Sequence, residues 1–222
     1  MSLIKAIRAQ LGLSNTATNN FTLDASADNG TMKLARGNAG ATTQDILTVD
    51  ASGNVNAPVS IQQGGVATGR MVLATAQNST SGTSIDFTGI PSWVKRITVS
   101  LQGVSTNGSS LKLVQVGSGS VSSTGYLATS TSLGAAAATT SSTAGFVINA
   151  NTAADIHSGH LTLTLVSGNT WVCSYVLKEL TTFMVIGAGD ITLGGALDRV
   201  RITTVNGTDT FDAGSINIMY EG

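Results

Sequence analysis

Apolar and polar residues alternate along much of the chain with the period of a β-strand. Within residues 96–102 and 160–165, apolar side chains occupy every second position and polar side chains stand between them. A period of two places the apolar groups on one face of a sheet. Segments of this kind, separated by turn residues, predict strands at 71–76, 83–88, 94–102, 110–116, 145–150, 160–166 and 170–178. They indicate an all-β domain of about 150 residues, an antiparallel β-sandwich or jelly roll.

Two further strands are predicted at 197–205 and 215–220. Val200, Ile202 and Thr204 alternate with polar residues in the first, as do Ile216, Ile218 and Tyr220 in the second. The turn-rich sequence at 206–209 lies between them, and Phe211 follows as a candidate core contact. We expect the two strands to form an antiparallel hairpin that closes the domain.

Residues 15–70 show a weaker version of the same pattern. Short strands are expected at 20–24, 31–35, 46–50 and 59–62, separated by turns rich in Asn, Asp and Gly. Each strand offers too few apolar side chains to offset a conformational entropy cost of about 1–2 kcal/mol per residue. Pairing with identical segments around a three-fold axis would close the sheet edges and form a β-stalk. A disordered linker is the alternative.

The first fourteen residues carry a different period. The apolar residues recur at helical spacing between a candidate N-cap, Ser2, and a stop at Gly12; they are Leu3, Ile4, Ile7 and Leu11. A helix of about ten residues is not stable alone. We expect it to anchor the chain to another protein, or alternatively to fold back on the chain's own core. The expected organisation is therefore a helix at 1–14, a stalk at 15–70 and a β-sandwich at 71–222, with a glycine-rich boundary at 63–69.

Composition narrows the classes of partner. Charged residues make up 10% of the chain and the net charge is −1, so no basic surface is expected for nucleic acid or an anionic membrane. No apolar run approaches the roughly 20 residues of a membrane-spanning helix. Residues 1–13 do not have the pattern of a secretory signal. The single cysteine, Cys173, alternates with Trp171 and Tyr175, which predicts a core residue.

Few residues suggest a catalytic or metal-binding site. His157 and His160 lie near Asp155 and are weak candidates for a metal site, because residues 158–159 are expected to form a turn rather than a strand that aligns the imidazoles. Asp209 and Asp212 flank Phe211, and a turn accounts for both. No nucleophile elbow, phosphate loop or zinc spacing occurs. The sequence therefore predicts no enzyme and no cofactor.

A low-complexity segment occupies residues 121–143. It is rich in Ser, Thr and Ala and contains three larger side chains, Tyr126, Leu127 and Leu133. One interpretation is an exposed loop that offers these residues to a receptor, since binding groups often lie on loops held by a rigid scaffold. The other is an insertion that covers a sheet edge.

Two stretches carry a resemblance to a known family. Residues 82–102, GTSIDFTGIPSWVKRITVSLQ, and 197–222, LDRVRITTVNGTDTFDAGSINIMYEG, are similar to a C-terminal domain of tail and fibre proteins of bacteriophages and prophages. The segments 90–97 and 198–201 are its more specific parts. Residues 31–54 resemble the shaft that often precedes such domains.

The resemblance implies a homotrimeric virion protein. Its N-terminal helix would attach to a tail, neck or capsid protein, and its C-terminal head would bind a glycan or protein of the host surface. A capsid or neck decoration fibre with no receptor is the alternative. A depolymerase would require carboxylates that face each other across a groove, and no such pair is marked in the sequence.

Overall fold

The computed structural model of the 222-residue chain describes residues 8–12, 16, 19–25, 30–39, 41–57, 62–63, 66–67, 69–134, 136–149, 152 and 155–222. The chain divides into two compact units, Met1–Thr68 and Gly69–Gly222, here called the N-terminal and C-terminal units. The described residues contain no α-helix, and all their strand pairs are antiparallel. The expected all-β antiparallel class is confirmed, while the jelly-roll assignment stays a prediction.

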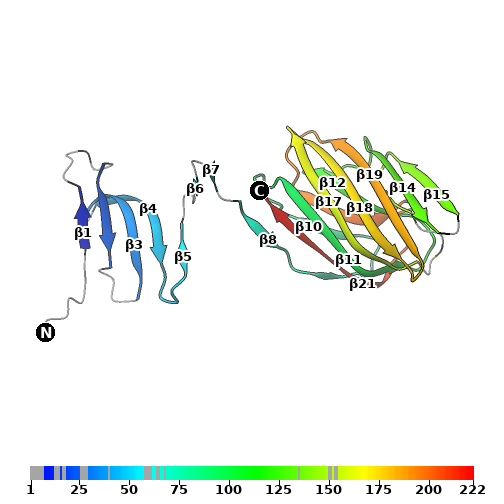
Figure 1. Cartoon of the computed structure of the whole chain (residues 1–222), viewed down its shortest axis with the longest axis horizontal. Helices are drawn as coiled ribbons and strands as arrows, with labels where there is room; N and C mark the ends of the chain where they lie inside the picture. The colour runs from blue at the N-terminus through cyan, green and yellow to red at the C-terminus, as the bar shows by residue number, and fades with distance from the viewer. Residues whose placement is uncertain are drawn as a thin grey trace. The chain divides into compact units, whose positions relative to one another are not determined.

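The N-terminal unit contains a five-stranded meander in which each strand pairs with the next along the chain (Figure 1). A separate small pair follows it. The strands are β1 (Arg8–Leu11), β2 (Phe21–Asp24), β3 (Met32–Asn38), β4 (Ala41–Val49) and β5 (Val55–Asn56), then β6 (Gln62–Gln63) with β7 (Val66–Ala67). Residues 58–61, which include most of the strand expected at 59–62, lie outside the described residues.

The prediction of an N-terminal helix is wrong for those residues of the segment that the structure describes. Leu11 lies in the strand β1, opposite Phe21 of β2, and is 56% exposed. The hydrogen bonds of that strand pair and the Arg8–Asp24 ion pair of 2.9 Å hold these residues extended, although their intrinsic helix propensity is good. Leu3, Ile4 and Ile7 lie outside the described residues.

The C-terminal unit contains two sheets. The long sheet has nine strands in the order β15-β14-β19-β18-β17-β11-β21-β8, with β9 also paired to β21. The short sheet has the order β10-β20-β12-β13, with β16 also paired to β12. Their bounds are β8 (Met71–Leu73), β9 (Gln77–Asn78), β10 (Ile85–Thr88), β11 (Arg96–Thr106), β12 (Lys112–Ser118), β13 (Ser120–Val121), β14 (Leu127–Leu133), β15 (Ala137–Ser142), β16 (Phe146–Ile148), β17 (His157–Ser167), β18 (Thr170–Glu179), β19 (Phe183–Thr192), β20 (Arg199–Thr204) and β21 (Phe211–Glu221).

The two sheets share one hydrophobic core. Alternate residues of the long sheet, such as Ile97 and Leu163, and of the short sheet, such as Ile202, belong to the same buried cluster. Trp171 and Cys173 lie in it, which confirms the prediction for the cysteine. Burial raises the pKa of the Cys173 thiol to about 12, so this side chain behaves as a small apolar group.

The C-terminal hairpin does not form, although both of its strands do. β20 pairs with β10 and β12 in the short sheet, whereas β21 pairs with β11 and β8 in the long sheet. Phe211 is buried at the start of β21, as expected. Each strand buries the alternate face that its sequence predicts, but the connection crosses from one sheet to the other. The alternation of apolar and polar residues specifies which face of a strand is buried, but it does not specify which strand pairs with it.

Two regions for which no strand was predicted form strands. Residues 121–143 contain the β14–β15 hairpin, which extends the long sheet at its edge, so the interpretation as an exposed loop is wrong. β19 was not predicted either, because Gly187 and Gly189 interrupt its apolar pattern. Its ten residues pair on both sides, with β14 and β18. Backbone hydrogen bonds to two neighbours thus outweigh the weak strand propensity of glycine.

We predict that core truncation in β17 is costly and that surface truncation in the same strand is not. Leu163 is fully buried, and Leu163→Ala should lower the free energy of unfolding by about 2–5 kcal/mol because it leaves a cavity. Val166 is 62% exposed, and Val166→Ala should change it by less than about 0.5 kcal/mol. Urea unfolding followed by tryptophan fluorescence measures both. Equal losses would contradict the assigned core.

Candidate functional site

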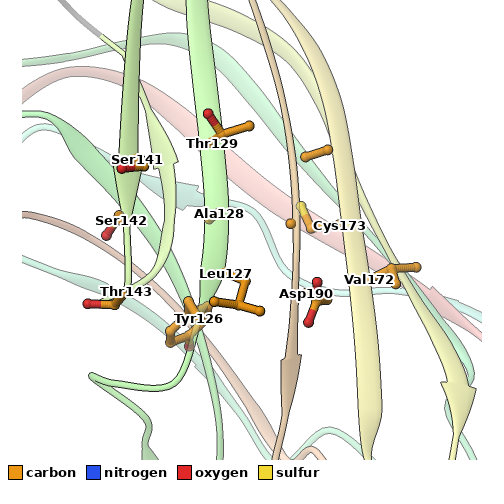
Figure 2. Close-up of a pocket in the computed structure, with 12 residues that line it drawn as sticks. Tyr126, Leu127, Ala128, Thr129, Ser141, Ser142, Thr143, Val172, Cys173 and Asp190 are labelled. Carbon is orange, nitrogen blue, oxygen red and sulfur yellow. The ribbon is translucent and has the colours of Figure 1, made fainter.

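An open groove of about 870 Å³ lies on the long sheet, over strands β14, β15, β18 and β19. Figure 2 shows Leu127, Asp190 and Val172 on three neighbouring strands at one end of this outer groove. Leu127 is 68% exposed and Val172 is 39% exposed. The remaining lining is mostly hydroxyl groups and small residues: Thr129, Ser141, Ser142, Thr143, Ala188 and Gly189.

The register of the strands explains where the groove runs. One row of outward residues is small, because Thr129, Ala188 and Ser174 lie opposite one another on β14, β19 and β18. The rows on either side carry larger side chains. One contains Leu127, Asp190 and Val172, and the other contains Thr131, Ile186 and Val176. The groove follows part of the row of small residues, at Thr129 and Ala188, and the row with Leu127, Asp190 and Val172 lies along one side of it.

The inner side of β19 is packed tightly beneath the groove. A Cβ at Gly187 would lie 2.1 Å from the hydroxyl oxygen of Tyr175, which donates a short hydrogen bond to the carbonyl oxygen of Val147. A Cβ at Gly189 would lie 2.5 Å from the carbonyl oxygen of Leu127. These two glycines let β18, β16 and β14 approach β19 closely, so the floor of the groove is held by buried packing.

The three residues expected on a receptor-facing loop have different positions. Tyr126 is fully buried, so the expectation that it is open to a ligand is wrong. Its hydroxyl donates to the carbonyl oxygens of Val116 and Ser122 and accepts from the Val116 N–H, and its ring packs edge-on against Phe146. Leu127 and Leu133 are exposed on the outer face of β14, and Leu127 lines the groove.

The chemistry of the outer groove suits a neutral polar ligand. Asp190 is the one charged residue of its lining, and its carboxylate accepts hydrogen bonds, while the Thr and Ser hydroxyls both donate and accept. Leu127 and Val172 offer an apolar surface beside these groups. The described lining thus offers hydrogen-bonding hydroxyls, one carboxylate and a small apolar surface to a ligand.

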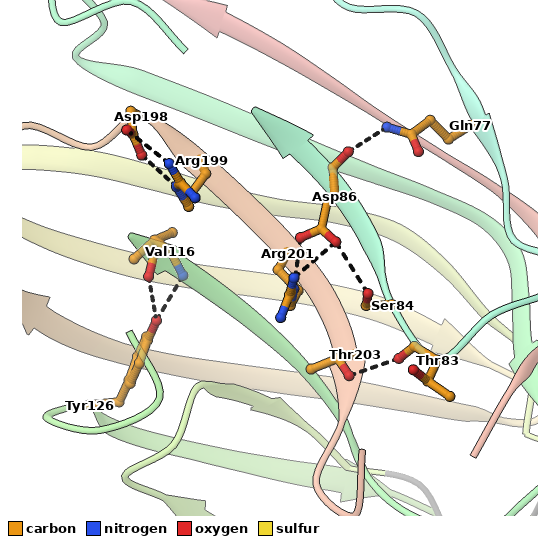
Figure 3. Close-up of polar contacts among 10 residues, drawn as sticks. All are labelled: Gln77, Thr83, Ser84, Asp86, Val116, Tyr126, Asp198, Arg199, Arg201 and Thr203. Carbon is orange, nitrogen blue, oxygen red and sulfur yellow. Dashed lines mark hydrogen bonds and ion pairs between the residues drawn. The ribbon is translucent and has the colours of Figure 1, made fainter. Parts of the chain in front are cut away.

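Several residues in the two stretches that resemble phage fibre domains have structural roles. Arg201 makes a bidentate ion pair with Asp86 across β20 and β10, at 2.7 and 3.1 Å (Figure 3). The Asp198 carboxylate accepts hydrogen bonds from Arg199, at 2.7 Å, and from the Gly119 N–H, at 3.0 Å. The bond from Arg199 is the largest factor that lowers the pKa of Asp198.

A second group of polar residues lies inside the C-terminal unit. This buried polar cluster consists of Lys112, Asp155, His157 and Glu179, each at most 2% exposed. Lys112 Nζ donates to the backbone carbonyl oxygen of Asp155 at 3.4 Å, and Ser132 Oγ donates to Glu179 Oε2 at 2.5 Å. Because all four are shielded from solvent, the cluster is part of the scaffold. The alternation of apolar and polar residues did not reveal this cluster, since a charged residue on a strand normally indicates the face that is exposed to solvent.

The histidines do not form a metal site. Both belong to β17, which continues through Ser158 and Gly159, so the turn expected there is wrong. His157 is buried and its Nε2 lies 3.1 Å from the Asn149 carbonyl oxygen, whereas His160 is exposed and its Nδ1 lies 3.1 Å from Ser100 Oγ. Across the described part of the chain, no group of three His, Cys, Asp or Glu side chains could hold a metal ion.

Burial makes the cluster sensitive to pH. Desolvation, and next the charge of Lys112, lower the pKa of His157 to about 4. The Nε2 atom donates to the Asn149 carbonyl oxygen, so a neutral ring leaves Nδ1 as an acceptor, and among the described residues Nδ1 has no hydrogen-bond partner. Burial raises the pKa of Glu179, and a hydrogen bond with Asp155 acts in the same direction, against the Ser132 hydrogen bond.

We predict that His157 makes the protein less stable in mild acid. The unfolded chain protonates this histidine near pH 6.5 and the folded chain only near 4, so the unfolded state binds more protons between these values. From pH 7.5 to 5 the free energy of unfolding should fall by about 2 kcal/mol through His157. Urea unfolding at both pH values tests this. His157→Gln should reduce the loss by that amount.

Two features of that experiment isolate the histidine. The raised pKa of Glu179 has the opposite effect on the free energy of unfolding, because above pH 4.5 the folded state then binds more protons than the unfolded state. The contribution of His157 is therefore the difference between the loss in the wild type and the loss in His157→Gln. His160→Gln is the matched control, since His160 is exposed on the same strand. If His157→Gln retained the full wild-type loss, the assignment would be wrong.

Comparison with known proteins identifies no relative. Neither a protein-family model nor a curated protein nor a solved structure matches the chain. In the residues that the structure describes, no helix is long and apolar enough to cross a membrane. The chemistry of the outer groove and the stretches that resemble phage fibre domains are therefore the basis for a functional proposal.

Proposed function

We propose that the chain is a structural protein of a bacteriophage virion, a homotrimeric fibre that attaches to the particle through its N-terminal region. Its C-terminal unit, with a jelly-roll-like sandwich, forms the head and binds the surface of the host cell. The resemblance of residues 82–102 and 197–222 to phage fibre domains motivates the proposal. The division into two all-β units supports it, because a fibre needs one part for assembly and another for display.

The outer groove is the observation that carries the binding role. It is an exposed hollow on a sheet whose opposite side is packed in the core, and its lining combines Asp190, several hydroxyl groups and the exposed apolar side chains of Leu127 and Val172. Hydroxyls and a carboxylate can bind the hydroxyl groups of a glycan or the backbone of an extended peptide. Three copies of a weak site on one fibre would raise the apparent affinity without new contacts.

A decoration fibre on the capsid or neck is the second candidate. The groove offers no exposed aromatic side chain on which a sugar ring could stack, since Tyr126 is buried. This observation favours a role without a specific receptor. The two candidates differ in position on the particle, and an antibody against the C-terminal unit would distinguish them by electron microscopy of intact virions.

We predict that the full chain, labelled at its N-terminus, adsorbs to host cells and that filling the groove abolishes adsorption. Ala188 is exposed in the row of small residues, so Ala188→Trp would occupy the groove without entering the core. Cell-bound fluorescence should fall at least about tenfold, a loss of about 1.4 kcal/mol in binding free energy.

Val166→Trp is the matched control. Val166 is exposed on β17 and does not line the groove, so this variant should adsorb like the wild type. Unfolding curves of both variants should match that of the wild type, which separates lost binding from lost structure. No adsorption by the wild type would favour the decoration fibre, and unchanged adsorption by Ala188→Trp would place the binding site elsewhere.

A further inference from the structure

The buried polar cluster brings together residues from both sheets of the C-terminal unit. Lys112 begins β12 in the short sheet. His157 and Glu179 lie opposite each other on β17 and β18 of the long sheet, and Asp155 lies just before β17. Lys112 and Asp155 are 1% and 2% exposed, and Glu179 is fully buried. One amine and two carboxyl groups are therefore enclosed together inside the unit.

An ionised Lys112 is poorly satisfied in this position. An ammonium group offers three donors, and among the described residues its Nζ makes one hydrogen bond, the 3.4 Å bond to the Asp155 carbonyl oxygen. Burial lowers the pKa of Lys112, and the charge of Asp155 opposes burial more than that of any other carboxylate. A lowered pKa favours the neutral amine, whose free electron pair makes it a nucleophile.

The side chain of Asp155 is prepared for attack by such an amine. Its Oδ2 accepts a hydrogen bond from the Thr152 N–H at 2.8 Å, and its Oδ1 accepts one from Thr152 Oγ1 at 3.0 Å. The Glu179 carboxyl is hydrogen-bonded to the Asp155 carboxyl, which requires a proton between the two acids. Burial raises the pKa of Glu179, so Glu179 can carry this proton, and Ser132 holds it at 2.5 Å.

We propose that Lys112 and Asp155 form an intramolecular amide bond, with Glu179 as the acid and base of the reaction. The bond between Nζ and the Asp155 carboxyl carbon forms, and one C–O bond of that carboxyl breaks. Glu179 gives a proton to the departing oxygen, which leaves as water, and takes one back from the nitrogen. The Thr152 N–H stabilises the negative charge on the remaining oxygen. The reaction consumes no oxidant and no cofactor.

The bond would stabilise the C-terminal unit in two ways. It replaces a buried amine and a buried acid with one uncharged amide, which is less costly to enclose. It also connects the short sheet to the long sheet across 43 sequence positions, which restricts the unfolded chain. The desolvation of His157, which is the larger cause of its lowered pKa, is unaffected. The inference goes beyond the proposed function and does not depend on host binding.

The mass of the denatured full chain tests the inference. Closure of one amide bond releases one water molecule, so the wild-type mass should be about 18 Da below the mass of its sequence. Chymotryptic digestion followed by tandem mass spectrometry should give two peptides that are joined between Lys112 and Asp155. Fluorescence of Trp93 and Trp171, which both lie in the C-terminal unit, reports whether that unit is folded.

Three variants locate the reaction. Lys112→Met lacks the amine and should have the mass of its sequence. Glu179→Gln retains both reacting side chains but cannot transfer the proton, so it should also have the mass of its sequence. Lys178→Met is the matched control, because Lys178 is exposed beside Glu179 on β18, and it should lose one water as the wild type does.

A fourth variant applies if Glu179→Gln does not fold. Ser132→Ala removes the hydrogen bond that positions Glu179 and should slow closure at least about tenfold, measured as the fraction of closed chain against time after synthesis.

Each result supports or overturns the inference. A folded wild type with the mass of its sequence would overturn it, as would a loss of water in Lys112→Met. A peptide joined through Glu179 in place of Asp155 would contradict the assigned acceptor. Closure at the wild-type rate in Glu179→Gln or Ser132→Ala would exclude Glu179 from the reaction. None of these results bears on the fibre proposal, since adsorption to host cells is measured separately.

Discussion

The structure depends on one constraint, that a β-sheet must bury one of its faces. In the C-terminal unit two sheets meet this constraint together, because the inward residues of both form a single core around Trp171, Leu163 and Ile202. In the N-terminal unit a single sheet carries an apolar face that its own strands leave open. The same sequence rule, alternation of apolar and polar residues, thus produces a shared core in the C-terminal unit and a partly exposed apolar face in the N-terminal unit.

The sequence predicted which residues of a strand are buried better than it predicted which strands are neighbours. Val200 and Ile202 in β20 and Ile216 and Ile218 in β21 are all buried, yet the two strands belong to different sheets. Alternation is a local property, whereas pairing depends on segments more than a hundred residues away, as between β10 and β20. The predicted helix failed at Leu11 for the same reason, because pairing with β2 overrides local propensity.

The candidate site was only partly visible in the sequence. Leu127 was selected as one of the few large side chains in a low-complexity segment, and it does line the outer groove. The groove itself arises from the register that places Thr129 of β14 beside Ala188 of β19, two small residues about sixty positions apart in the chain. No local pattern reveals such a pair. The buried polar cluster was missed because Lys112 and Glu179 look like surface residues until the sheets are assembled.

The position of β21 has a consequence for synthesis. This strand lies between β11 and β8 in the long sheet and also pairs with β9, so the first strands of the C-terminal unit are held by residues 211–221. While the ribosome is still adding those residues, β8 and β9 have no strand to join. The C-terminal unit therefore completes its fold only after translation has passed residue 221, whereas the local meander of the N-terminal unit can form while the chain is still growing.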